Sequence, residues 1–153
     1  MVRTRMGLVL GLMLALGAVA CGSDNVLEGS ISESISLNFD RVDILKQGQS
    51  LRIEYIREVS GGTNKAAMLI LDTTGLSLTD DAVLKDDTFM AKVELQRLTS
   101  AGDEFPEISS GELRFFKFAF SEGDTVDGEF NVFFVNGRTL HGEFKGKIKE
   151  VTL

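Results

Sequence analysis

The chain has 153 residues, the length of one domain, and carries 16 basic and 23 acidic side chains, for a net charge of −7 at neutral pH. Such an acidic chain lacks the basic surface that nucleic-acid phosphates require, which excludes nucleic-acid binding. Its single cysteine, Cys21, also excludes an intrachain disulfide framework.

The first 20 residues have the composition of a signal peptide. Arg3 and Arg5 form a short basic region, and residues 6–20 are an uncharged apolar run of 15 residues. A membrane-spanning helix needs roughly 20 apolar residues, whereas the apolar core of a signal peptide is shorter. Removing residues 1–20 leaves 133 residues with a net charge of −9. A mature chain of this length is long enough for a single packed core.

The segment around the expected cleavage point, residues 18–23, reads Ala-Val-Ala-Cys-Gly-Ser. It resembles a lipobox, the cleavage site of bacterial lipoprotein signal peptides, in which the cysteine becomes the first residue and receives the lipid. The resemblance implies that Cys21 is lipidated and holds the protein on a membrane outside the cytoplasm. In enterobacterial-type lipoproteins an Asp after the cysteine favours the inner membrane. This chain has Gly22 there, which favours the outer membrane.

Two other interpretations of the same segment stay open. The lipobox pattern favours Leu three residues before the cysteine, where this chain has Ala18. Ala18-Val19-Ala20 is also an A-x-A site for ordinary secretory cleavage, which would release a soluble protein with an N-terminal Cys21. An uncleaved N-terminal anchor is the third interpretation.

Residues 21–30 are rich in Gly, Ser, Asp and Asn and are interpreted as a tether, followed by a single all-β domain over residues 31–153. Apolar and polar residues alternate along much of this domain, and turn signals separate the alternating runs. Short connections favour antiparallel neighbours, hence an antiparallel β-sandwich or a partly closed barrel of about eight strands. The expected strands cover residues 31–39, 41–46, 50–59, 65–72, 88–98, 110–120, 126–135 and 138–151.

One short helix is expected over Thr79–Asp87, because Thr79 can cap its first turn and two acidic residues follow it. A second local feature is an aromatic-rich strand with apolar groups on both faces. We interpret it as part of the core, with a ligand groove lined by phenylalanines as the alternative. Its apolar residues are Leu113, Phe115, Phe116, Phe118 and Phe120.

The last two strands form a predicted hairpin around Asn136-Gly137, a strong turn signal between alternating runs. A loop of odd length places the apolar residues of both strands on one face, whereas an even loop mixes the faces. We therefore expect the three-residue loop Asn136–Arg138, and a bulge at Gly137 would fit it. The expected pairs are Phe134–Leu140, Val132–Gly142 and Phe130–Phe144 on the apolar face, and Phe133–His141, Asn131–Glu143 and Glu129–Lys145 on the polar face.

The pattern of this hairpin, G-x-F-x-V-x-F-x-N-G-x-x-L-x-G-x-F, resembles the closing hairpin of many small uncharacterised bacterial lipoproteins. It covers about 20 of the 133 mature residues, and the resemblance implies a fold without an activity. The matching residues are Gly128, Phe130, Val132, Phe134, Asn136, Gly137, Leu140, Gly142 and Phe144.

Candidate catalytic and metal-binding residues are few. His141 is the only histidine, and the alternation places it on a solvated face with Glu143 and three lysines, which predicts a surface imidazole. The chain has no G-x-S-x-G motif for a nucleophile and too few Cys and His residues for a typical zinc site. Two acidic groups lack the EF-hand spacing for calcium and are interpreted as solvated loops, with calcium binding as the alternative. They are Asp80, Asp81, Asp86 and Asp87, and Asp124, Asp127 and Glu129.

The sequence thus predicts a lipid-anchored protein of the cell envelope that acts as a non-enzymatic binding or structural module, with no cofactor and no metal. Its expected partner is the membrane, reached through the lipid on Cys21, while a protein or small-molecule ligand is not specified. The alternative is a lipocalin-like carrier, because an eight-stranded barrel can hold one small apolar ligand.

Overall fold

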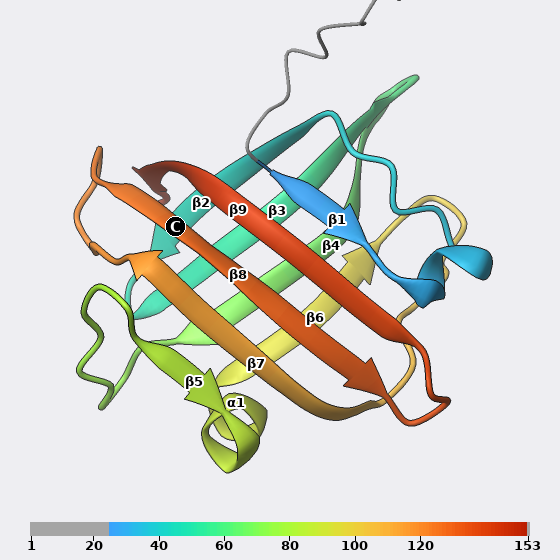
Figure 1. The fold of residues 1–153 in the computed structure, drawn as a ribbon. Coiled ribbons are helices and arrows are strands. Elements are labelled where there is room, and N and C mark those ends of the chain that lie inside the picture. The colour runs from blue at the N-terminus through green and yellow to red at the C-terminus, as the bar shows by residue number, and fades with distance from the viewer. Residues whose placement is uncertain (1–24, 153) are drawn as a thin grey trace, which may run out of the picture.

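The computed structural model describes residues 25–152, so the predicted signal peptide and the predicted lipidation site at Cys21 lie outside the described residues. The described chain forms one nine-stranded sheet that curls into a half-barrel (Figure 1). The all-β fold class expected from the alternation is therefore confirmed. The strands are β1 Val26–Glu28, β2 Arg41–Gln47, β3 Ser50–Val59, β4 Gly62–Asp72, β5 Val83–Lys85, β6 Val93–Leu98, β7 Ile108–Lys117, β8 Thr125–Phe134 and β9 Thr139–Glu150.

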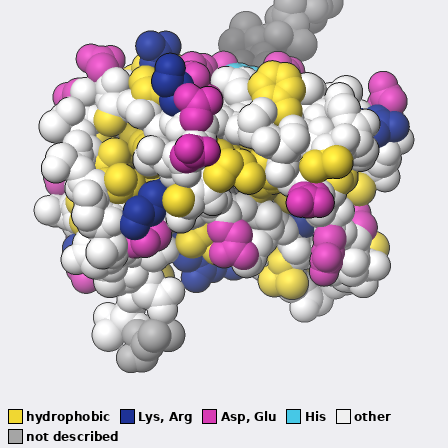
Figure 2. Space-filling model, turned by 90° about the horizontal axis from the view of Figure 1, so that it is seen from below, with side chains coloured by type: hydrophobic (Ala, Val, Ile, Leu, Met, Phe, Trp, Pro, Cys, Tyr) yellow, Lys and Arg dark blue, Asp and Glu magenta, His cyan; other side chains and the backbone are white. Residues whose placement is uncertain are grey.

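The strand order across the sheet is β5-β7-β8-β9-β2-β3-β4-β6, and β1 pairs with β9 beside this path. All neighbours run antiparallel except β2 and β9, which are parallel. In Figure 1, β7, β8 and β9 form a front layer that crosses over a rear layer of β2, β3, β4 and β6. The path ends at β5 and β6, so the barrel stays open on that side. Seen from below, apolar side chains reach the surface between charged ones (Figure 2).

The space between the two layers is filled by side chains from alternate positions of both. Tyr55, Phe115, Phe130 and Phe144 are each no more than 1% exposed. The Tyr55 ring meets Phe130 edge-on at a centroid distance of 6.1 Å, which links the rear layer to the front one. The other fully buried large side chains are Phe89, Ile31, Ile44, Leu51, Ile53, Leu69, Leu71 and Leu113.

Six predicted strands correspond to β2, β3, β4, β7, β8 and β9, but the strand predicted over 31–39 is wrong. A 3-10 helix, η1, covers Ser30–Glu33, and residues 34–40 form a loop. Ile31 and Leu37 are buried in the core, so the apolar positions mark contacts of a loop rather than a pleated strand. The intervening serines bond locally, as when the Asn38 N–H donates to Ser36 Oγ.

The predictions between residues 79 and 98 are also partly wrong. The helix α1 covers Asp86–Lys92, whereas the predicted helix 79–87 contains a turn and strand β5. Strand β6 begins at Val93, so the first part of the predicted strand 88–98 is helical. Phe89 is buried from the helix and Val93 from the first position of β6, while Ala91 is exposed. Alternation of apolar residues was misleading here because Ala91 does not pack inward.

The closing hairpin has the predicted odd loop, but the loop comes one residue earlier. The Phe134 N–H donates to the Arg138 carbonyl at 2.9 Å, which leaves Val135, Asn136 and Gly137 as the loop. Gly137 has φ +81°, a left-handed conformation that glycine adopts without strain. The predicted apolar face is confirmed, whereas every pair shifts by two residues: Val132 lies opposite Leu140.

The segment interpreted as a tether contains a strand. Val26–Glu28, at the start of the described chain, pairs with residues 141–143 of β9. Farther along the same edge of β9, residues 148–150 pair with β2. Neither helix among residues 25–152 has the length and apolar run needed to cross a membrane.

Candidate functional site

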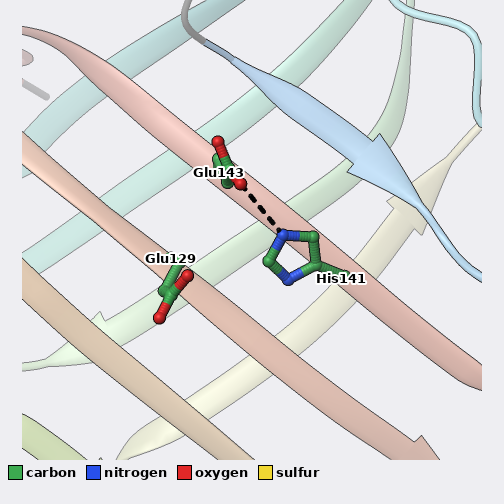
Figure 3. A group of neighbouring side chains, drawn as sticks. All are labelled: Glu129, His141 and Glu143. Atoms are coloured by element: carbon green, nitrogen blue, oxygen red, sulfur yellow. Dashed lines mark hydrogen bonds and ion pairs between the residues drawn. The ribbon is translucent and has the colours of Figure 1, made fainter.

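The outer face of the front layer carries a histidine next to two carboxylates. Strands β8 and β9 place Glu129 opposite Glu143 and Asn131 opposite His141. Paired residues of antiparallel strands point to the same side of the sheet, and the alternate positions of these two strands face the core. Figure 3 shows the imidazole of His141 facing the carboxylates of Glu129 and Glu143 from one side.

The distances in this cluster are short. His141 Nδ1 lies 2.9 Å from Asn131 Oδ1, and His141 Nε2 lies 3.3 Å from Glu143 Oε1. One ligand atom from each of Glu129, His141 and Glu143 lies within 4.8 Å of the others. No other group of three or more His, Cys, Asp or Glu side chains among residues 25–152 is gathered closely enough to hold an ion.

The backbone beneath the cluster is held by the core. The Tyr55 hydroxyl donates a hydrogen bond of 2.8 Å to the carbonyl oxygen of Glu143. Phe130 and Phe144, next to the cluster residues in β8 and β9, are buried on the inner face. The candidate ligands therefore stand on strands rather than on loops, so their spacing is fixed by packing.

A second candidate site is a hollow of about 250 Å³ at one end of the half-barrel. It lies where the loop after η1 meets the loop after β6, above the ends of β3 and β4. Most of the residues that line it are polar, and they include two arginines and one carboxylate. The lining residues are Ser34, Ile35, Ser36, Asn38, Arg57, Asn64, Ala66, Arg97, Thr99, Ser100, Ala101 and Asp103.

Arg97 fixes the shape of this hollow. Its guanidinium donates to the carbonyl oxygens of Ser36 at 2.9 Å and Ala66 at 2.8 Å and pairs with Asp103 at 3.0 Å. The Thr99 hydroxyl and the Arg97 guanidinium hold the pKa of Asp103 below its usual value. Because the Arg97 side chain is only 5% exposed, it acts as a clamp that joins three segments.

Arg57 has a different environment in the same hollow. Among the described residues its guanidinium makes one hydrogen bond, to Ser36 Oγ at 3.4 Å, and no ion pair. Arg97 and Asp103 balance each other, so Arg57 leaves the lining with one uncompensated positive charge. Its remaining N–H groups are available to an acceptor from outside.

The aromatic-rich segment 113–120 is divided between the core and a shallow hollow. Leu113 and Phe115 are fully buried, and Phe116 is 45% exposed. Phe118 and Phe120 follow the end of β7, stack on each other, and line a hollow of about 230 Å³ with Leu76 and Leu78. The core interpretation is correct for the first two residues, while the last two lie at the surface of the core.

The two acidic groups noted in the sequence do not assemble into sites of their own. Asp80 accepts a hydrogen bond from the Phe118 N–H at 2.8 Å, which fixes the turn before β5. Asp127 pairs with Lys145 at 3.1 Å. Glu129 instead belongs to the cluster around His141, and Cys21 lies outside the described residues.

None of the protein families, curated proteins or solved structures compared with this chain matches it.

Proposed function

We propose that the protein is a lipid-anchored component of the bacterial cell envelope. Its β-domain binds, without catalysis, a small anionic ligand in the hollow beside Arg57. The observation that carries the ligand proposal is the uncompensated guanidinium in a preformed polar hollow. The anchor rests on the lipobox-like segment at Cys21, with the outer membrane favoured by Gly22.

Residues near the start of the described chain support a short anchor. Asn25 Oδ1 accepts a hydrogen bond of 2.6 Å from the Lys145 N–H, and β1 then joins β9. Cys21 precedes Asn25 by four residues, and a fully extended chain of that length spans at most about 14 Å. A lipid on Cys21 would therefore keep the domain close to the membrane surface.

The size and charge of the hollow define the expected ligand. Ligand pockets for drug-sized molecules run from about 300 to 1,000 Å³, so a hollow of about 250 Å³ suits a smaller ligand. A guanidinium binds carboxylate and phosphate groups through paired N–H donors. The hydroxyls of Ser34 and Ser100 and the amide of Asn38 add neutral partners. A small carboxylate or phosphate ion fits this lining.

The ligand proposal is tested with inorganic phosphate and acetate as probes. In NMR titrations of the full chain purified in detergent, we expect shifts of amide signals in the two loops that line the hollow. Arg57→Gln should abolish these shifts. Arg114→Gln removes the same charge from an exposed position on β7, so it should leave them intact. Equal shifts in both variants would rule out the hollow as the binding site.

The anchor is tested separately by metabolic labelling with a palmitate analogue. We expect the wild-type chain to be labelled and to fractionate with membranes, and Cys21→Ala to lose both properties. Unlabelled wild-type protein would favour secretory cleavage after Ala20. Labelling that persists in Cys21→Ala would contradict lipidation at this cysteine.

The lipocalin-like carrier is the second candidate function, and the filled interior weighs against it. Such a carrier holds an apolar ligand between its layers, where Tyr55, Phe115, Phe130 and Phe144 occupy the space. What favours a carrier is the hollow beside Phe118 and Phe120, which is smaller than the usual range for drug-sized ligands. Saturable binding of an apolar dye, lost in Phe120→Ala, would support it.

A further inference from the structure

We propose that Glu129, His141 and Glu143 form a binding site for a divalent first-row transition metal ion, with Zn²⁺ as the reference ion. The site lies on β8 and β9 (Figure 3), whereas the hollow of the proposed function is lined by residues of β3, β4, β6 and two loops. Neither proposal depends on the other, because the hollow is built from different strands and loops.

The spacing of the side chains fits one ion. Zinc binds imidazole nitrogen and carboxylate oxygen at about 2.0–2.2 Å, so two ligands of one ion lie no more than about 4.4 Å apart. The three potential ligand atoms already lie within 4.8 Å of one another. To bind one ion the side chains have to draw these atoms slightly closer together, and all three residues stand on the paired strands β8 and β9.

The hydrogen bond to Asn131 prepares the imidazole for this role. When Nδ1–H donates to Asn131 Oδ1 at 2.9 Å, the lone pair of a neutral imidazole is on Nε2. Nε2 faces Glu143 Oε1 at 3.3 Å, so two acceptors confront each other. A cation between them removes this repulsion. This cation is either a proton on Nε2 or a metal ion, and we assign the metal ion.

The ligand types select the class of ion. Calcium and magnesium prefer oxygen ligands alone, whereas an imidazole with carboxylates suits zinc and its first-row neighbours. Two carboxylates balance the charge of a divalent ion. Water would complete the coordination.

The single histidine makes the site easy to observe. The imidazole carbon-bound protons and ring nitrogens give NMR signals from His141 alone when the full chain is purified in detergent without a histidine tag. We expect substoichiometric Zn²⁺ to shift or broaden these signals and to saturate at one ion per chain. Mg²⁺ and Ca²⁺ at the same concentrations should leave them unchanged.

Variants assign the ligands. Zn²⁺ affinity measured by calorimetry should fall below detection in His141→Gln and fall strongly in Glu129→Gln and Glu143→Gln. Glu122→Gln makes the same change in an exposed loop residue and should bind as the wild type does. Asn131→Leu should weaken binding roughly 10- to 100-fold, as expected for loss of an outer-shell partner. It should also redistribute the imidazole proton between Nδ1 and Nε2, which the ring ¹⁵N shifts report.

The titration of the unaltered chain decides the proposal even if a variant does not fold. His141 signals that respond to acid but not to Zn²⁺ would mean that the cation between Nε2 and Glu143 is a proton, and would overturn the metal site. Zn²⁺ binding of equal strength in wild type, Glu129→Gln and Glu143→Gln would overturn it as well.

Discussion

The ring of Phe130 lies directly opposite Gly142, so close that a β-carbon on Gly142 would be 2.3 Å from Phe130 Cε1. The Tyr55 hydroxyl oxygen would lie 2.8 Å from this β-carbon. Gly142→Ala therefore forces a buried ring to move. We expect it to lower the free energy of unfolding by about 1–3 kcal/mol, measured by urea denaturation.

Gly62→Ala is the matched control for this substitution. Gly62 is also a strand glycine, but nothing lies within 4 Å of the position of its β-carbon. A change within about 0.5 kcal/mol is expected. Similar losses in both variants would show that loss of glycine in a strand, rather than the contact with Phe130, sets the stability.

The buried carboxylate of Glu54 leads to a second prediction. Glu54 is 3% exposed and pairs with Arg52 and, at 2.8 Å, with Lys65. Glu54→Gln keeps the shape of the side chain and removes its charge. We expect it to lower the free energy of unfolding, measured by urea denaturation, by about 1–3 kcal/mol. Removing one charge from a fully buried ion pair would lower the stability further. Here both cations, Arg52 and Lys65, are partly exposed and keep some water.

Glu58→Gln on the same strand is the control for Glu54. Its side chain is 55% exposed and pairs with Arg41 at the surface. Exposed pairs contribute about 1 kcal/mol or less. The prediction fails if the two variants lose equal stability.

Tyr55 should make the domain sensitive to alkali. Burial, and secondly the charge of Glu143, raises the pKa of the Tyr55 hydroxyl above its ordinary value of about 10. The folded state thus holds its proton more tightly than the unfolded state. This contribution to stability is complete below about pH 10 and is lost as the pH rises further.

Because Tyr55 is the only tyrosine of the chain, its ionisation can be followed directly by absorbance. Near-ultraviolet absorbance should show no tyrosinate until alkaline unfolding begins, whereas the urea-unfolded chain should ionise near its ordinary pKa. Tyr55→Phe should remove this alkaline loss, at a cost of about 1–2 kcal/mol near neutral pH for the lost hydrogen bond. Ionisation of the folded protein at the same pH as the unfolded one would contradict the burial.

Asp72 should make the stability of the domain depend on pH in the acidic range. Hydrogen bonds from Thr74, first from its hydroxyl and then from its backbone N–H, together with one from Lys92, lower the pKa of Asp72 to about 2. The folded state therefore favours the ionised carboxylate. The resulting stability is present above the unfolded value of 3.8 and is lost as the pH falls toward 2.

Comparing wild type with Asp72→Asn checks this effect. The difference between their urea midpoints should be constant near neutral pH and shrink as the pH falls below 3.8. In Thr74→Ala, which lacks the hydroxyl, the Asp72 pKa read by NMR should rise. A difference that does not depend on pH would rule out ionisation of Asp72 as the cause.

Part of the candidate metal site could be predicted from the sequence. Alternation correctly placed His141 on the outer face and predicted an odd hairpin loop. The predicted loop began one residue late, which would pair Glu129 with Lys145. In the structure Glu129 lies opposite Glu143, and this shift of two residues brings the second carboxylate to His141. Both registers keep the same apolar face inward, so hydrophobic patterning alone could not choose between them.

The errors elsewhere have a related cause. Ile31 and Leu37 are buried, as predicted, but from a 3-10 helix and a loop. Phe89 and Val93 are buried from a helix and from the strand after it. Pattern predicts which side chains reach the core more reliably than it predicts the backbone that carries them. The hollow beside Arg57 could not be predicted, since it joins residues of four distant segments.

The position of β9 has a consequence for how the domain folds. It is the last strand in the sequence, yet it has β8 on one side and both β1 and β2 on the other. The front and rear layers therefore cannot join until residues 139–150 have been synthesised. Such long-range pairing slows folding. Until then β1 has no partner in the sheet and β2 has only β3, although β2, β3, β4 and β6 can already pair with one another.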